Sequence, residues 1–302
     1  MSHWIINCLS RELPASLQSS SSARAVTHRR VYNPAMELCT CPLCFEALIR
    51  VGGSLKCARG HSYDLAREGY VNLLTAQHRR SKAPGDNPEM ISARGRFLDA
   101  GYYRPLAEAL CAAVAAGGTV STLVDLGCGE GYFTQLLSDR LHTVYGIDIS
   151  RAAIRAATRR SKSVCYAVAS TARVPLIDRG FDAVTVVMAP LGADISRILK
   201  LDGRLYRVSA GPDHLIQLKQ QIYAQARIHD RARERLDQFA LINSQRLTFE
   251  FTIDGNHLAD LIAMTPMRYT TARHQQEQVS QLDQLSLTAD FYLDEFGLAV
   301  SS

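Results

Sequence analysis

The feature that most constrains the fold is a glycine-rich loop near the middle of the chain, Asp125-Leu126-Gly127-Cys128-Gly129-Glu130-Gly131. An apolar run, Val120–Leu126, leads into this loop, and a helical pattern, Tyr132–Leu141, follows it. Glycines at alternate positions let the backbone turn sharply and approach a ligand without obstruction by Cβ atoms. A strand, a tight turn and a helix in this order predict a ligand-binding loop of an α/β sheet.

The segments around the loop support this fold class. The apolar runs after the loop are predicted as strands: Thr143–Ile149, Val164–Ala169, Phe181–Met188 and Arg204–Ser209. Helical patterns occupy Glu89 to about Ala100 and Arg151–Arg160, and Asp213–Phe239 is expected to form one or two charged helices. Two final strands, Arg246–Ile253 and Ser286–Phe296, are expected around a helix at Asn256–Met264. Alternation of this kind predicts a Rossmann-like, doubly wound sheet, mostly parallel, with an antiparallel C-terminal hairpin.

An acidic residue indicates which ligand the loop binds. Asp148 ends the strand after the loop, 21 residues beyond Gly127, where a carboxylate can accept hydrogen bonds from both hydroxyls of a ribose. The dinucleotide fingerprint G-x-G-x-x-G is not met, because Tyr132 stands where its third glycine belongs. The form D-x-G-x-G-x-G, from Asp125 to Gly131, is similar to motif I of the class I methyltransferases. That resemblance implies S-adenosylmethionine, a cation that suits nearby carboxylates.

A cysteine cluster near the N-terminus predicts a zinc-binding β module. Cys41 and Cys44 are followed after twelve residues by Cys57 and then by His61, an arrangement that suits tetrahedral zinc. Since no fifth protein group is evident, a structural site is favoured over a catalytic one. Cys39 could compete with Cys41 for one ligand position, although the spacing prefers Cys41. The segment is too short to hold a core unaided, so metal binding and folding should be coupled.

Length and composition set broader limits. The 302 residues divide into four predicted regions: a tail at 1–36, the zinc module at 37–75, a linker and helix at 76–104, and a methyltransferase domain at 105–302. The Arg- and Ser-rich tail has three interpretations, namely a disordered segment, sequence upstream of a start at Met36, or an organellar transit peptide. Clustered thiols and the lack of a recognisable signal peptide favour the cytoplasm. No apolar run is long enough for a membrane helix, and the net charge of +5 is compatible with a nucleic-acid partner.

Beyond the two motifs, residues 41–296 resemble the bacterial 23S rRNA (guanine-N1)-methyltransferases of the RlmA type. The matching segments before the glycine-rich loop are His61–Asp64, Glu68–Leu74, Gln77–Lys82, Pro84–Asp86, Met90, Ala93-Arg94, Phe97–Gly101 and Tyr103. The matching segments after it are Gly211-Pro212, His214-Leu215, Leu218-Lys219 and Met264–Pro266.

The resemblance implies cofactor contacts from Tyr103, Gly129, Glu130 and His214, and zinc ligation by Cys41, Cys44, Cys57 and His61. It also implies that N1 of a guanine in a domain II hairpin of 23S rRNA is methylated, and that the protein can form a homodimer. Two departures from the family's pattern bear on the choice of guanine. Leu191 follows Ala189-Pro190 where relatives often have cysteine, and Leu201-Asp202-Gly203 replaces the usual Pro-Gly-Gly turn.

Several functional assignments stay open from the residues alone. Asp86 and Glu89 are candidates for the base that removes the N1 proton, or else helix-capping residues. Tyr103 or Tyr132 could stack on a base or on adenine, and ordinary packing is the alternative for Tyr132. The basic segments Arg79–Lys82 and Arg151–Arg160 could follow phosphates, although a solvated outer helix face explains the second. A small-molecule methyltransferase and a cofactor-binding protein without catalysis are the alternative functions.

Overall fold

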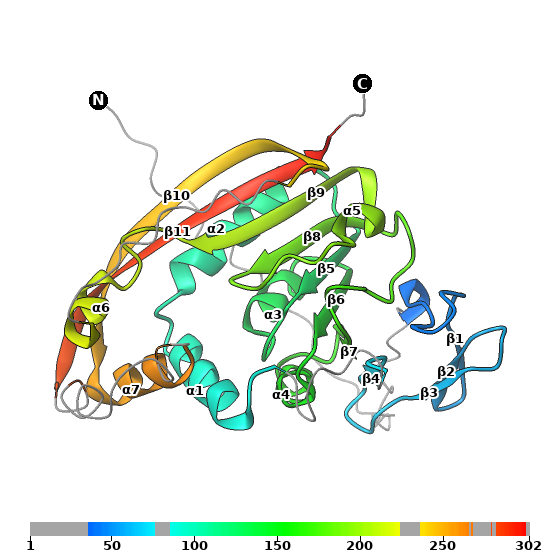
Figure 1. Ribbon diagram of the computed structural model, residues 1–302, viewed down its shortest axis with the longest axis horizontal. Helices are drawn as coiled ribbons and strands as arrows, with labels where there is room; N and C mark the ends of the chain where they lie inside the picture. Colours follow the sequence, from blue (N-terminus) through cyan, green and yellow to red (C-terminus); the bar gives the residue numbers. More distant parts are fainter. Residues whose placement is uncertain are drawn as a thin grey trace, which may run out of the picture. The chain divides into compact units, whose positions relative to one another are not determined.

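The structure, a computed structural model, describes residues 36–75, 85–223, 236–265, 267, 279 and 282–299. They belong to one compact unit of the chain, Asn33–Ser302. Figure 1 shows a large central sheet with a long β-hairpin at one end and a small three-stranded sheet beyond the other. The predicted tail and the basic run Arg79–Lys82 lie outside the described residues.

The central sheet has eight strands in the order β10-β11-β9-β8-β5-β6-β7-β4. Its strands are β4 (Val71–Asn72), β5 (Thr122–Leu126), β6 (Thr143–Asp148), β7 (Cys165–Val168), β8 (Phe181–Val187), β9 (Leu199–Ala210), β10 (Phe239–Asp254) and β11 (Gln284–Leu298). Neighbouring strands from β9 to β4 run parallel, whereas β11 is antiparallel to β9 and β10 is antiparallel to β11. The predicted doubly wound sheet with an antiparallel C-terminal hairpin is confirmed.

Seven α-helices of the described residues pack around the sheet. They are α1 (Pro88–Asp99), α2 (Arg104–Ala116), α3 (Tyr132–Ser138), α4 (Arg151–Arg160), α5 (Ile195–Ile198), α6 (Ile216–Ile222) and α7 (Gly255–Ala263). Asn87 caps α1 by accepting a hydrogen bond from the Met90 N–H at 3.0 Å. Arg96 of α1 forms an ion pair with Asp260 of α7, so two helices far apart in sequence pack together.

Both faces of the sheet are buried, as the continuous apolar strands require. On β5, Leu123 packs into the core on one face, while Val124 and Leu126 pack into the core on the other. Tyr166 of β7 and Phe181 of β8 are fully buried on opposite faces. The carboxyl ends of the parallel strands therefore meet at one edge, where ligands bind in open α/β sheets.

The zinc-binding module has its own three-stranded antiparallel sheet, β1 (Ile49–Val51), β2 (Ser54–Lys56) and β3 (Ser62–Asp64), after a short 3-10 helix, Met36–Leu38. The segment after this sheet returns to the main fold, because β4 pairs in parallel with β7 and forms one edge of the central sheet. This pairing was not predicted.

Several predicted elements differ from the structure. Helix was expected over Asp213–Phe239, but α6 covers only Ile216–Ile222, Phe239 begins strand β10, and residues 224–235 are not described. The terminal strands β10 and β11 are longer than predicted because they pair with each other along almost their whole length. Helix α2 was not predicted at all. In the described part of the chain, no helix is long and apolar enough to span a membrane.

Candidate active site and metal centre

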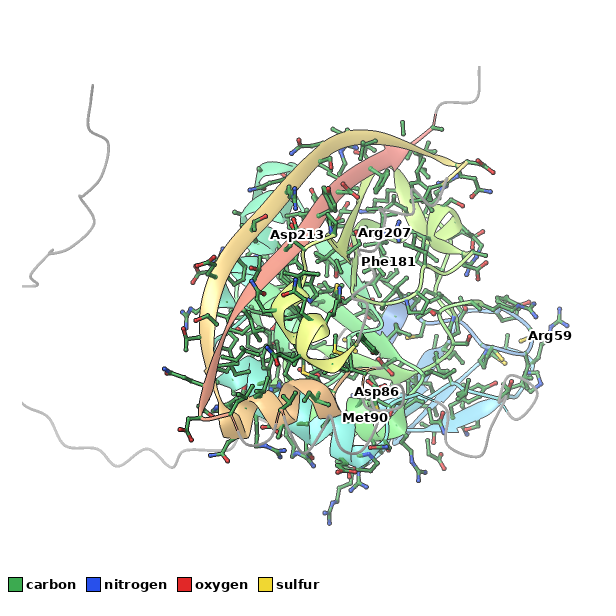
Figure 2. The ribbon with its side chains drawn as sticks, turned by 60° about the vertical axis from the view of Figure 1, so that its left-hand side comes forward. Arg59, Asp86, Met90, Phe181, Arg207 and Asp213 are labelled. Atoms are coloured by element: carbon green, nitrogen blue, oxygen red, sulfur yellow. The ribbon has the colours of Figure 1, made fainter. Side chains whose placement is uncertain are left out.

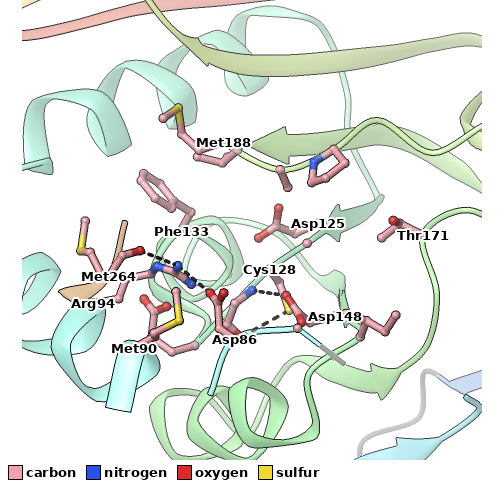
Figure 3. Close-up of a pocket in the computed structure, with 18 of the residues that line it drawn as sticks. Asp86, Met90, Arg94, Asp125, Cys128, Phe133, Asp148, Thr171, Met188 and Met264 are labelled. Atoms are coloured by element: carbon pink, nitrogen blue, oxygen red, sulfur yellow. Dashed lines mark hydrogen bonds and ion pairs between the residues drawn. The ribbon is translucent and has the colours of Figure 1, made fainter. Parts of the chain in front are cut away.

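A pocket of about 980 Å³ opens at the carboxyl ends of the parallel strands. Such a volume is near the upper end of the roughly 300–1,000 Å³ typical of small-molecule sites. Its walls come from the glycine-rich loop, from α1 and from the segments that follow β6, β7 and β8. Figure 3 shows Met188 across the pocket from Asp86 and Asp148, with Asp125 between them. All seven residues predicted to contact the cofactor line it: Tyr103, Asp125, Gly127, Gly129, Glu130, Asp148 and His214.

The glycine-rich loop has the close packing that its glycines predict. Gly127 and Gly131 have φ angles of +76° and +85°, which side chains of L-residues rarely tolerate. A Cβ atom on Gly127 would lie 2.5 Å from the Ala189 Cβ, and one on Gly131 would lie 2.9 Å from the Ala157 Cβ. The loop is therefore wedged between the end of β8 and helix α4, and larger residues cannot occupy these two positions without displacing their neighbours.

Asp148 holds the loop as well as facing the pocket. Its two carboxylate oxygens accept hydrogen bonds from the Gly129 N–H at 3.0 Å and from the Ser150 N–H at 2.7 Å. Burial raises the pKa of Asp148, while the two N–H donors oppose that rise. Since a carboxylate has about four acceptor positions, these contacts leave capacity for ribose hydroxyls.

The charged groups of the described pocket lining are mostly acidic. Asp125 is almost fully buried, and burial raises its pKa to about 6, although the hydroxyls of Thr134 and Thr185 donate to its two oxygens and oppose the rise. Burial also raises the pKa of Glu130. The described lining has four carboxylates (Asp86, Asp125, Glu130 and Asp148) against one guanidinium, that of Arg94. A bound cation would replace the hydration that these carboxylates lack, so the residues present fit a sulfonium cofactor.

The only guanidinium of the described lining is itself paired. Arg94 of α1 forms an ion pair with Asp86 at 2.6 Å and donates to the Met264 carbonyl oxygen at 3.3 Å (Figure 3). The Asp86 carbonyl oxygen accepts from the Ser150 hydroxyl at 2.9 Å. These contacts tie the segment before α1 to α4 and to the end of α7.

The end of β8 forms the opposite wall. Met188 has a φ angle of +52° and is half exposed, which is unusual for a large apolar residue. Ala189 and Pro190 line the pocket beside it, whereas Leu191 is absent from its described lining. An exposed apolar wall facing an acidic one gives the pocket two chemically distinct sides, one for a cation and one for a flat apolar surface.

Four sulfur and nitrogen atoms converge in the zinc module. The Nδ1 atom of His61 lies 3.4 Å from the Cys41 sulfur, 3.6 Å from the Cys44 sulfur and 3.3 Å from the Cys57 sulfur. The sulfur atoms of Cys44 and Cys57 are 3.7 Å apart. A tetrahedral ion with Zn–S of about 2.3 Å and Zn–N of about 2.0–2.1 Å needs S···S of about 3.8 Å and S···N of about 3.6 Å. The residues present therefore fit zinc.

The surroundings of this cluster shift the pKa values of two of its thiols in opposite directions. Burial opposes ionisation of Cys41, but the Tyr63 hydroxyl at 3.2 Å and the backbone N–H groups of Leu43 and Cys44 lower its pKa to about 7. Burial raises the pKa of Cys44, and the neighbouring thiols of Cys41 and Cys57 act in the same direction. Cys39, the predicted competitor, is buried away from the cluster of four, and burial raises the pKa of its thiol far above the usual value.

The zinc module is joined to the pocket wall through the backbone. Cys39 forms an antiparallel bridge with Leu176, and the Thr40 N–H donates to the Pro175 carbonyl oxygen at 2.9 Å. The guanidinium of Arg173 stacks over the Phe45 ring at 4.3 Å. These contacts lie within a few residues of Ser170–Ala172, which line the pocket. Figure 2 shows Arg59 on the outlying zinc module, away from Asp86 and Met90.

Some lining residues had no predicted role. Phe133, Met90, Arg94, Thr171 and Met188 all line the pocket. Met90 and Arg94 belong to segments that resemble the methyltransferase family, and this resemblance was the one sequence signal that could have indicated their place in the pocket.

Other predicted candidates lie elsewhere. Tyr132, proposed to stack on a base, is absent from the described lining and packs against Phe133, with Arg160 near its ring. Glu89 lies on the exposed first turn of α1, outside the described lining, whereas Asp86 does line the pocket. In α4, Arg155 pairs with Glu68 and Arg160 pairs with Asp99, so part of its charge is already neutralised.

Comparison with known proteins identifies both regions. The family model of the RlmA N-terminal zinc ribbon matches residues 39–82, and a methyltransferase domain model matches residues 123–208. YxjB of Bacillus subtilis, whose name places it among the 23S rRNA (guanine-N(1)-)-methyltransferases, is 32% identical over 83% of this chain and 93% of its own length. The 23S rRNA (guanine(748)-N(1))-methyltransferase of Streptomyces fradiae is 32% identical over 75% of this chain and 84% of its own.

Among solved structures, a geranyl diphosphate methyltransferase in complex with S-adenosylmethionine is similar over 72% of this chain and 93% of its own, at 20% identity and a TM-score of 0.43. The assignment does not depend on that likeness. The two sequence relatives, aligned over most of both chains, show that this chain belongs to the 23S rRNA (guanine-N1)-methyltransferases, which are S-adenosylmethionine-dependent enzymes with a zinc ribbon.

Proposed function

We propose that this protein transfers a methyl group from S-adenosylmethionine to N1 of a guanine in a hairpin loop of 23S rRNA domain II. The observation that carries the proposal is a pocket whose described lining has four carboxylates, with the exposed Met188 across it from Asp86 and Asp148. Its volume of about 980 Å³ leaves space for a base beside the cofactor. The name of the Streptomyces fradiae relative makes the guanine corresponding to position 748 the first to examine.

The cofactor side is assigned residue by residue. When bound, S-adenosylmethionine supplies an electrophilic methyl group on a positively charged sulfur. We assign the ribose hydroxyls to Asp148, because its carboxylate is fixed by two backbone N–H groups. Asp125 and Glu130 would face the positive charges of the cofactor, and the backbone at Gly127 and Gly129 would let it approach closely. Tyr103 and His214, which also line the pocket, are the remaining two residues assigned to the cofactor.

The base side receives a guanine taken out of its stack. The Watson–Crick edge of a guanine in an A-form stem is inaccessible, so the target must lie in a loop whose bases can turn outward. Met188 and Pro190 offer the base an apolar surface. Asp86 lies across the pocket from Met188 and pairs with Arg94 (Figure 3), so its position favours a role in holding α1 over removal of the N1 proton.

The zinc ribbon has a structural role in this proposal. Cys41, Cys44, Cys57 and His61 would hold one zinc ion and keep Cys39 and Thr40 paired with the segment next to the pocket. The ribbon carries Arg59 on its outer side, where RNA phosphates can approach; its guanidinium is exposed and lies 3.7 Å from the Glu46 carboxylate. A cytoplasmic location and a homodimer presenting two ribbons to the RNA accord with this role.

Methyl incorporation tests the function. The full-length protein is incubated with labelled S-adenosylmethionine and either deproteinised large-subunit RNA, the same RNA after heat denaturation, or a set of small methyl acceptors. We expect label in folded RNA, less incorporation at high salt, and none with Gly129→Arg protein. Label confined to the small molecules, with no salt dependence, would instead establish a small-molecule methyltransferase.

A further inference from the structure

Helix α4 presents a row of arginines to solvent. Arg151, Arg155 and Arg159 recur at every fourth residue, and all three are exposed. The opposite face of α4 is buried and consists of Ala153, Ile154, Ala157 and Thr158. Four residues advance about 6 Å along a helix axis, so the row extends over about 12 Å of the protein surface.

The turn between β3 and β4 adds two cations beside this row. Its Glu68 carboxylate pairs with Arg155 at 3.2 Å, and its Glu68 carbonyl oxygen accepts from the exposed Lys162 ammonium at 3.4 Å. The backbone N–H of Glu68 lowers the pKa of that carboxyl, and the charges of Arg155 and the exposed Arg67 lower it further. The α4 basic surface is defined here by five residues: Arg67, Arg151, Arg155, Arg159 and Lys162.

The α4 basic surface has few acidic partners. Of its five cations, only Arg155 forms an ion pair within the described ranges, and the partner is Glu68. Arg160 pairs with Asp99 and does not belong to the exposed row. Five cations against one carboxylate leave this surface strongly positive.

The stability of α4 does not account for this arrangement. Arg151 is the first residue of the helix, where the helix dipole disfavours a cation. Arginines four residues apart on one helix also repel each other. A solvated outer face, the alternative considered from the sequence, explains the exposure of these side chains but leaves both unfavourable terms in place. An anion bound along the row would reverse them.

The α4 basic surface lies between the pocket and the zinc ribbon. Arg151 comes two residues after Ile149, which lines the pocket, and the intervening Ser150 hydroxyl donates to the carbonyl oxygen of the lining residue Asp86 at 2.9 Å. At the other side, Arg67 belongs to the turn that follows β3, the last strand of the zinc module. Figure 1 shows α4 between α1 and β4. An RNA strand that reaches the pocket from the ribbon therefore passes this surface.

We infer that the α4 basic surface binds successive phosphates of the RNA strand next to the methylated loop. This inference rests on the proposed function. A row about 12 Å long is too extended for a single phosphate, and contacts with the backbone would orient the RNA without selecting the guanine. A protein partner is disfavoured, because protein interfaces have an apolar centre and none of the exposed large apolar residues of the described chain lies on α4 or on the turn.

Binding to a transcript of 23S rRNA domain II tests the inference. The full-length protein is compared by filter binding with Arg151→Gln/Arg159→Gln, which removes two cations that form no ion pair among the described residues. The logarithm of affinity falls with the logarithm of salt concentration by about 0.7–0.9 per phosphate contact. The variant should lose about 1.4–1.8 of this slope and bind the transcript roughly 25- to 60-fold more weakly at about 0.1 M salt.

Two further variants separate charge at this surface from other effects. Arg151→Lys/Arg159→Lys should recover most of the affinity for the transcript, because an ammonium also binds phosphate. Lys200→Gln/Arg204→Gln removes the same charge at the start of β9, at the edge of the parallel sheet opposite the pocket, and should bind the transcript like wild type. All the variants should bind S-adenosylhomocysteine with unchanged affinity by calorimetry, which also shows that they are folded.

Four results would overturn the inference: wild-type RNA affinity and salt slope for Arg151→Gln/Arg159→Gln, a lysine variant as weak as the glutamine variant, an equal loss for Lys200→Gln/Arg204→Gln, or an equal loss of affinity for S-adenosylhomocysteine. The proposed function fails separately, if the wild-type protein with S-adenosylmethionine methylates no RNA.

Discussion

Replacement of Asp125 by asparagine should remove a defined part of the pH dependence of cofactor binding. Burial raises the pKa of Asp125 to about 6 in the free protein. A positively charged ligand stabilises the carboxylate, so binding is strongest where Asp125 is already ionised. The affinity for S-adenosylmethionine is therefore full above about pH 6 and is lost as the pH falls through that value.

The size of the effect follows from the titration of one group. If the bound ligand keeps Asp125 ionised, the dissociation constant rises by the factor 1 + 10^(pKa − pH), which is about 11 at pH 5 and about 1 at pH 7.5. A tenfold change corresponds to about 1.4 kcal/mol of binding free energy. Asp148 and Glu130 also have raised pKa values, and the Asp148 carboxylate contributes to that of Asp125. Both groups remain in both proteins, so most of their own pH dependence cancels in the comparison.

The assay is calorimetric titration of S-adenosylmethionine into wild-type and Asp125→Asn protein between pH 5 and 7.5. Asparagine can keep both neighbours, because the hydroxyls of Thr134 and Thr185 can donate or accept. The wild-type dissociation constant should rise about tenfold more than that of the variant on going to pH 5. Parallel pH profiles for the two proteins would refute this account of Asp125.

The remaining predictions concern the zinc ribbon and the glycine-rich loop. Cys57→Ala should lose the metal, measured by atomic absorption, and should bind S-adenosylmethionine more weakly, because the ribbon is bridged to the segment beside Ser170–Ala172. The control Cys111→Ala, at a buried site in α2, should retain zinc. Loss of zinc from Cys57→Ala with unchanged cofactor affinity would contradict this coupling between the ribbon and the pocket. Gly131→Ala should lower the thermal midpoint of unfolding further than Gly118→Ala. Both glycines have positive φ, which costs an alanine roughly 1–2 kcal/mol, but of the two only Gly131 has neighbours within 3 Å of an added Cβ atom. Equal shifts of the midpoint would argue against close packing of the loop.

Local patterns were sufficient for the parts of the site that are continuous in sequence. Gly127, Gly129 and Gly131 directly follow β5, and Asp148 ends β6, so a strand-by-strand interpretation placed them at one edge of the sheet. The spacing of the cysteines indicated the zinc cluster for the same reason: each pair of ligands comes from a single turn. Short apolar runs were enough to predict most strands of the parallel part of the sheet within a few residues.

Contacts between distant segments had no such signal. Strand β4 has two residues, and its partner β7 begins almost a hundred residues later, so nothing local predicts the pairing. The contact between Tyr103 and His214 likewise depends on the fold, and only the family resemblance singled out these two residues.

Other features were missed for different physical reasons. Met188 was expected to end an ordinary strand, but its positive φ turns the chain and leaves the side chain on the pocket wall. Helix α2 contains a run of alanines and small residues with a weak polar face, so its periodicity was easily overlooked. In β10 and β11, long-range pairing extended strands whose ends have no distinctive composition.

The most direct measurement of the central claim is to map the modified nucleotide. A methyl group on N1 blocks the Watson–Crick edge of guanine, so reverse transcriptase stops one nucleotide before it. Large-subunit RNA from a strain lacking this enzyme is treated with S-adenosylmethionine and either wild-type or Gly129→Arg protein. We predict a single new stop at a domain II loop guanine with the wild-type protein alone. Methylation at another atom or in another RNA, or no stop despite bound cofactor, would contradict the account.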